Sequence, residues 1–114
     1  MAEPRLKSRF WITALVRRCD LAAIGVAVVA RGDPDSGAVL LKLNGLDGTC
    51  TVLSQVHDAG GGGRAWMRAT GPAPVAEAEA DAYIARQRGR DPDLWVVEIE
   101  SASPEALIDT QILS

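Results

Sequence analysis

The chain has 114 residues, of which 47% are apolar and 24% charged, with a formal net charge of −3 and a pI near 5.0. The high apolar content excludes an intrinsically disordered protein, and the acidic balance argues against a nucleic-acid binder with a generic basic surface. The length suits one domain over residues 1–114, and we expect its ends, residues 1–7 and 102–114, to be loosely ordered.

Neither a membrane segment nor a secretion signal is visible in the sequence. The longest apolar run, residues 21–30, is well below the roughly 20 residues that a transmembrane helix needs. The first residues lack the basic-then-apolar pattern of a signal peptide, so we expect a cytoplasmic protein without a membrane partner. Cys19 and Cys50 form no Cys-x-x-Cys motif, and we expect buried thiols rather than zinc ligands or a disulfide.

The first half of the chain predicts one helix followed by three strands. The helix runs from Ser8, its expected N-cap, to about Ala22. Residues 24–31 are apolar at both odd and even positions, which is typical of a central strand buried on both faces. Turns rich in Asp, Gly, Pro and Asn separate two further strands at residues 38–43 and 49–56, which indicates an antiparallel meander. The helix should bury the apolar residues at helical spacing: Trp11, Ile12, Leu15, Val16 and Cys19.

The second half predicts a strand, a helix and a last strand. A fourth strand at residues 64–69 follows the glycine run 60–63. Pro74 is expected to begin the second helix, which continues to about Arg88, with an acidic first half and a basic end that complement the helix dipole. Its buried face should contain Ala76, Ala80, Tyr83 and Ile84. The last strand covers residues 94–99, and Ser103-Pro104-Glu105 suggests a short terminal helix.

The element order α-β-β-β-β-α-β predicts an α+β fold. We expect a mostly antiparallel sheet of about five strands with two main helices. Because the last strand returns after a helix, it is expected to pair in parallel with an earlier strand.

Five segments form an ordered series of motifs: residues 17–19 (RRC), 31–38 (RGDPDSGA), 42–48 (KLNGLDG), 77–88 (EAEADAYIARQR) and 91–98 (DPDLWVVE). Together they resemble the Domain of Unknown Function 1491 family of small bacterial proteins, over about residues 6–100. The resemblance implies one compact cytoplasmic domain. It implies no activity, cofactor or site residue.

The fourth predicted strand contains the best candidate for a ligand site. Arg64, Trp66 and Arg68 share one face because side chains alternate along a strand. An indole between two guanidinium groups is suited to stacking a base or holding an anionic ligand. The more common role for such a tryptophan is to cover a sheet beneath a helix, with the arginine stems packed beside it.

The sequence assigns no catalytic residue, no metal ligand and no cofactor. His57, the only histidine, is seven residues from Cys50 in one predicted strand, so the two side chains should face opposite sides and form no dyad unless a bulge intervenes. Cys19 could approach His57 across the fold, but nothing in the sequence requires it. The loop aspartates Asp33, Asp35 and Asp47 fit turns better than a calcium-binding loop. The glycine run lacks the Gly-Lys-Ser/Thr of a phosphate-binding loop.

Three functions therefore stay open. The favoured one is a non-catalytic interaction module that binds another protein or a second copy of itself, because no nucleophile–base pair, metal cluster or cofactor motif is evident. The second is a binder of an anionic ligand or nucleic acid through Arg64, Trp66 and Arg68, although the acidic charge argues against nucleic acid. The third is an enzyme of unassigned chemistry that uses His57 or the loop of Asp33 and Asp35. Glu98 and Glu100, which share a strand face, are interpreted as a solvated surface.

Overall fold

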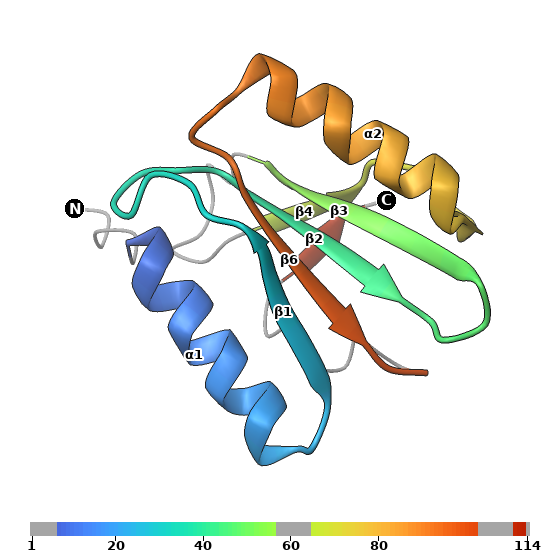
Figure 1. Ribbon diagram of the computed structural model, residues 1–114, viewed down its shortest axis with the longest axis horizontal. Coiled ribbons are helices and arrows are strands. Elements are labelled where there is room, and N and C mark those ends of the chain that lie inside the picture. The colour runs from blue at the N-terminus through green and yellow to red at the C-terminus, as the bar shows by residue number, and fades with distance from the viewer. Residues whose placement is uncertain (1–6, 57–64, 103–110, 114) are drawn as a thin grey trace.

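A computed structural model describes residues 7–56, 65–102 and 111–113. A seven-stranded mixed sheet lies at the centre, with one helix packed on each of its faces (Figure 1). The elements along the chain are α1 (Ser8–Leu21), β1 (Gly25–Ala30), β2 (Val39–Asn44), β3 (Thr49–Val56), β4 (Ala65–Arg68), β5 (Val75–Ala76), α2 (Glu77–Arg90), β6 (Trp95–Glu100) and β7 (Gln111–Leu113). This is the predicted α+β fold, with β5 and β7 added to the five expected strands.

The strand order across the sheet is β1-β6-β2-β3-β4-β7, and the short β5 pairs with β3. Strands β2, β3 and β4 form the predicted antiparallel meander. Strand β6 enters between β1 and β2, antiparallel to the first and parallel to the second. The expected parallel pairing of the last predicted strand is thus confirmed, with Leu41 opposite Val97 in the register.

Side-chain alternation divides the buried residues between the two faces of the sheet. On one face, α1 covers a cluster to which it contributes three of the predicted residues, Ile12, Leu15 and Cys19, with Trp11 and Val16 half-buried beside them. On the other face, α2 packs Ala80 and Ile84 on a smaller cluster as predicted, with Tyr83 half-buried beside them. Ala76 contradicts its prediction, because it lies in β5 and is exposed. Strand β2 serves both faces, because Val39, Leu41 and Leu43 point toward α1 while Leu40 points toward α2.

Strand β1 contradicts its prediction as a central strand buried on both faces. It is the edge of the sheet, and Val28 and Val29 are 40% and 52% exposed. The apolar pattern of β1 could not show its edge position, because that position depends on where β6 pairs. Strand β6 comes from the far end of the sequence and lies between β1 and β2.

The two helix starts also differ from their predictions. Ser8 lies inside α1, whose N-cap is Lys7, and its buried hydroxyl donates a 2.5 Å hydrogen bond to the carbonyl of Gly37. The first amides of α1 donate to carbonyls of the same distant loop, so the loop replaces a side-chain cap. Helix α2 starts at Glu77 rather than at Pro74, because Val75 and Ala76 pair with β3 first. The predicted terminal helix at Ser103 lies outside the described residues.

The loop between β1 and β2 packs closely on the loop between α2 and β6. The amide of Asp33 donates to the carbonyl of Asp93 at 3.0 Å, and the Trp95 Nε1–H donates to the carbonyl of Asp33 at 2.7 Å. At Gly32, a Cβ atom would collide with the carbonyl oxygen of Asp93, which is backbone and cannot rotate away. A glycine is therefore required where the two loops touch.

We expect Gly32→Ala to lower the free energy of unfolding by about 1–3 kcal/mol, the usual cost of forcing an extra carbon into a packed site. Urea denaturation followed by circular dichroism measures the change. The matched control is Gly89→Ala in α2, where an added Cβ meets no atom within 4 Å. Gly89 lies in the last turn of α2, and alanine there should raise stability by at most about 1 kcal/mol, because alanine has the higher helix propensity. Equal effects at the two positions would contradict the proposed loop contact.

Candidate functional site

The predicted ligand-binding residues do not form an exposed aromatic surface. Trp66 is 0% exposed, and its ring packs against that of Trp11 from α1 with centroids 5.4 Å apart. Its indole Nε1–H has no hydrogen-bond partner within the described part of the chain. Arg68 is half-buried, and Arg64 lies outside the described residues. The indole therefore serves as core beneath α1, and ligand binding by the three residues stays a prediction.

The candidate nucleophiles and turn aspartates have structural surroundings. Cys19 and Cys50 are buried free thiols, and burial raises the pKa of both, which disfavours the reactive thiolate. The Asp33 carboxylate accepts hydrogen bonds from the Ser36 amide and hydroxyl and from the Asp35 amide, which lower its pKa. It closes a turn, as predicted. His57 lies outside the described residues.

No group of three or more His, Cys, Asp or Glu residues within the described ranges could hold a metal ion. At the second predicted turn, the Asp47 carboxylate accepts hydrogen bonds from the hydroxyl and amide of Thr49, at 2.6 and 3.0 Å, which lower its pKa. The favoured interpretation of these aspartates as turn formers is confirmed at both loops.

A buried lysine surrounded by carboxylates is the feature that sequence reasoning missed. The Lys42 side chain is 7% exposed, and its Nζ lies 2.7 Å from Glu77, 2.8 Å from Asp81 and 3.7 Å from Glu98. Glu98 also accepts a 3.0 Å hydrogen bond from the side-chain NH₂ group of Asn44. The interpretation of Glu98 as a solvated residue is thus wrong, since its side chain is only 18% exposed, whereas Glu100 is exposed as predicted.

This cluster holds α2 on the sheet rather than offering a nucleophile. Burial alone would lower the pKa of Lys42, but hydrogen bonds to Asp81 and Glu77 and the charge of Glu98 outweigh it and raise the pKa well above its ordinary value. A raised pKa favours the protonated amine, which lacks the free electron pair that a nucleophile needs. The available sequence signal was a lone lysine between Leu41 and Leu43 in an otherwise apolar strand.

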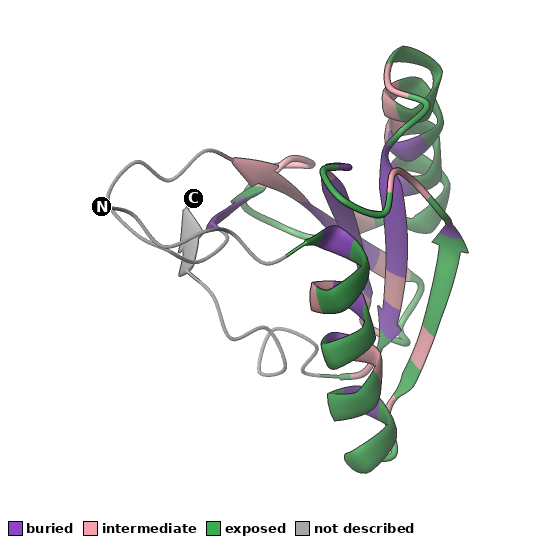
Figure 2. Ribbon diagram, turned by 90° about the vertical axis from the view of Figure 1, so that its left-hand side faces the viewer, coloured by how far each residue is buried: buried purple, intermediate pink, exposed green. Residues whose placement is uncertain are grey.

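Strand β1 lies at one edge of the described sheet and exposes apolar side chains. On one side β1 pairs with β6, and no described strand pairs with its other side. Figure 2 shows most of the strand exposed. Residues 25–30 contain neither charge nor proline, two of the usual devices that keep an edge from pairing, although the register shifts between Val28 and Ala30. Leu21, at the end of α1, adds a side chain that is 80% exposed.

The sequence model of a family described as "Protein of unknown function (DUF1491)" matches residues 6–109. The chain belongs to the DUF1491 family. Its fold matches a crystal structure of a DUF1491 family protein from Caulobacter crescentus CB15, with 33% identity and a TM-score of 0.81, over 95% of this chain and 99% of that one. An NMR structure of a DUF1491 family protein from the same organism has the same identity and TM-score, over 98% of this chain and 100% of the other.

A further similar fold is the solution structure of protein Atu0922 from A. tumefaciens. It shares 28% identity with this DUF1491 protein, with a TM-score of 0.81, over 97% of this chain and 98% of that one. Among curated proteins, none matches the chain. In the part of this DUF1491 protein that the structure describes, no helix has the length and apolar character to cross a membrane.

Proposed function

We propose that this DUF1491 protein is a non-catalytic, cytoplasmic interaction module that binds a second copy of itself through the free edge of β1. The observation that carries the proposal is an uncharged, largely exposed edge strand whose outer side pairs with none of the described strands. Such an edge is a template for a further strand, because its outward N–H and C=O groups otherwise bond only to water.

A second copy suits this edge because identical strands pair antiparallel about a two-fold axis. In such a pair each copy presents the same surface to the other, so the outward backbone N–H and C=O groups of one β1 strand bond to those of the other. No charged residue lies within residues 25–30, so the two strands would bring no like charges together. Pairing would also draw the exposed Val28 and Val29 toward the matching side chains of the partner copy.

The side-chain chemistry of the described residues supports a role without catalysis. The cysteines are buried with raised pKa values, and Lys42 is held in its protonated form by carboxylates. Free thiols also fit the reducing conditions of a cytoplasm.

We expect the protein to be a dimer in solution and Val29→Lys to make it a monomer, because a lysine on an edge strand opposes strand pairing. Val29 is 52% exposed, so the lysine can reach water without disturbing the core. Sedimentation equilibrium at 1–100 μM, about the range in which weak dimers form, measures the state. The matched control is Met67→Lys on β4, which is 45% exposed but paired on both sides, and this variant should stay dimeric.

A wild-type protein that is monomeric over the whole range would contradict self-association. A Val29→Lys variant that remains dimeric would show that the copies meet on another surface. Matching far-UV circular dichroism spectra for the wild type and the lysine variants would show that the change in mass is not due to unfolding.

A further inference from the structure

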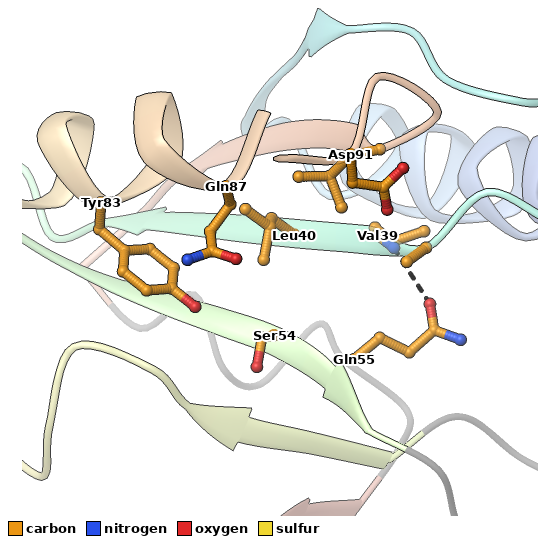
Figure 3. A pocket seen from close by; sticks show the side chains of 9 residues that line it. Val39, Leu40, Ser54, Gln55, Tyr83, Gln87 and Asp91 are labelled. Atoms are coloured by element: carbon orange, nitrogen blue, oxygen red, sulfur yellow. Dashed lines mark hydrogen bonds between the residues drawn. The ribbon is translucent and has the colours of Figure 1, made fainter. Parts of the chain in front are cut away.

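A small pocket lies between the C-terminal half of α2 and strands β2 and β3 (Figure 3). Its volume is about 260 Å³. Ala38, Val39, Leu40 and Leu94 supply its apolar part, and Ser54, Gln55, Tyr83, Gln87 and Asp91 supply its polar part. Strand β6 separates β2, which lines the pocket, from β1, so this site is independent of the proposed dimer edge.

Several polar groups of the pocket have unused hydrogen-bonding capacity. In Figure 3, Tyr83 and Gln87 project from α2 over β2 and β3, with their polar ends on the side of Ser54. None of these three side chains has a hydrogen-bond partner among residues 7–56, 65–102 and 111–113. Gln55 uses its oxygen to accept from the Val39 amide at 3.1 Å, which leaves its NH₂ group for other contacts.

The charge of the pocket favours a cation. Asp91 is the one charged residue in the lining, and it is half-buried. One of its carboxylate oxygens accepts a 3.0 Å hydrogen bond from the Asp93 amide, and no ion pair neutralises it within the described segments. Asp91 is also the C-cap of α2, where the helix dipole adds partial negative charge. Arg86 lies over the Tyr83 ring at 6.0 Å, and no arginine or lysine is among the residues that line the pocket.

The size of the pocket limits the ligand. A buried cavity of about 150 Å³ accepts benzene, and pockets for drug-sized ligands begin at about 300 Å³. A volume of about 260 Å³ therefore suits a molecule of a few heavy atoms. The buried side chains of Leu40 and Leu94, 3% and 6% exposed, form an apolar wall that suits a short alkyl chain.

From these contacts we propose that the pocket binds a small organic cation, a primary ammonium group on a short alkyl chain. The ammonium donates hydrogen bonds to the Asp91 carboxylate and to the oxygen of Gln87. The alkyl chain lies along Leu40 and Leu94, and the hydroxyls of Ser54 and Tyr83 can accept a further donor of a substituted ligand.

The first test compares three probes of nearly equal size and different charge. n-Butylammonium, butan-1-ol and butyrate are titrated into the ¹⁵N-labelled protein at pH 7, and amide shifts are followed by NMR. We expect butylammonium to shift the amides of Val39, Gln55 and Leu94 with saturation, with at least about tenfold weaker binding of butanol, because a hydrogen bond to an ionised group is the stronger kind. Butyrate should not bind at the pocket.

The second test removes the charge of the pocket while keeping its shape. Asp91→Asn retains an oxygen that can accept from the Asp93 amide, and we expect it to weaken butylammonium binding about tenfold or more. The control Glu79→Gln removes an exposed carboxylate from the same helix and should leave binding unchanged.

Three results would overturn the proposal: butyrate binding as tightly as butylammonium, shifts confined to residues away from the pocket, or an Asp91→Asn variant that binds as the wild type does. The probe comparison uses the wild-type protein alone, so it decides the matter even where the variant fails to fold. A monomeric protein would contradict the proposed dimer and leave this result unaffected.

Discussion

Replacing Trp66 with alanine is expected to lower the free energy of unfolding by about 3–5 kcal/mol, the typical cost of truncating a buried aromatic side chain. The indole is 0% exposed and packs against Trp11 and the cluster beneath α1. Alanine would leave a cavity that the sheet cannot fill, because β4 is held by β3 on one side and β7 on the other. Urea denaturation followed by far-UV circular dichroism measures the loss.

The adjacent Met67 provides the control for this experiment. It is 45% exposed on the opposite face of the same strand, so Met67→Ala should change stability by less than about 1 kcal/mol. A Trp66→Ala variant that is as stable as the wild type, but has lost affinity for an oligonucleotide or another anion, would contradict the packing role and favour the stacking site predicted from Arg64, Trp66 and Arg68.

Replacing Lys42 with methionine is expected to cost about 2–3 kcal/mol of stability. Methionine keeps most of the apolar volume, but Glu77, Asp81 and Glu98 lose the cation between them. Breaking a fully buried ion pair costs about 3–5 kcal/mol. The loss expected for Lys42→Met is smaller than this, because the Glu77 and Asp81 side chains are 47% and 56% exposed and water can solvate them.

The stability advantage of the wild type over Lys42→Met should decrease as the pH rises above the ordinary pKa of lysine. The pKa of Lys42 is raised in the folded protein above its ordinary value of 10.5. The favourable contribution is therefore fully present below about pH 10. Above pH 10.5 the unfolded chain loses this proton while the folded protein keeps it, so the wild type loses stability relative to the variant as the pH rises.

Melting temperatures of both proteins between pH 7 and 11.5, a range that spans the ordinary titration of lysine, measure this difference. Lys7→Met is the control, because the Lys7 side chain is 54% exposed and lies 3.7 Å from an exposed Asp35, a pair worth at most about 1 kcal/mol. A constant difference between wild type and Lys42→Met across this range would show that the raised pKa of Lys42 is not linked to folding.

Most elements were predictable because they depend on local patterns. The 3.6-residue period placed Ile12, Leu15 and Cys19 on the buried face of α1, and the alternation of β6 placed Trp95, Val97 and Ile99 together. Strand β3 occupies the predicted residues, Thr49–Val56. The helix starts were less predictable, because partners distant in sequence decided them: the loop at Gly37 for Ser8, and strand β3 for Val75.

The candidate sites were largely invisible to sequence reasoning. The proposed dimer edge exists because β6 inserts beside β1, and the pocket exists because α2 crosses β2 and β3. The one site that the sequence did indicate, around Trp66, has its indole in the core, because α1 covers the face of β4 that carries it. Residue patterns specify which side chains share a face, but they do not specify what covers that face.

By itself, the sequence of this protein determined the fold class, the strands of the meander and the parallel return of the last predicted strand, since these follow from periodicity, turn residues and connection length. Only the tertiary structure decided that β1 is an edge, that Lys42 is buried among carboxylates and that Tyr83, Gln87 and Asp91 line one pocket. The physical reason is that hydrophobic patterning is a local property, whereas strand neighbours and charge clusters arise from contacts between segments far apart in the chain.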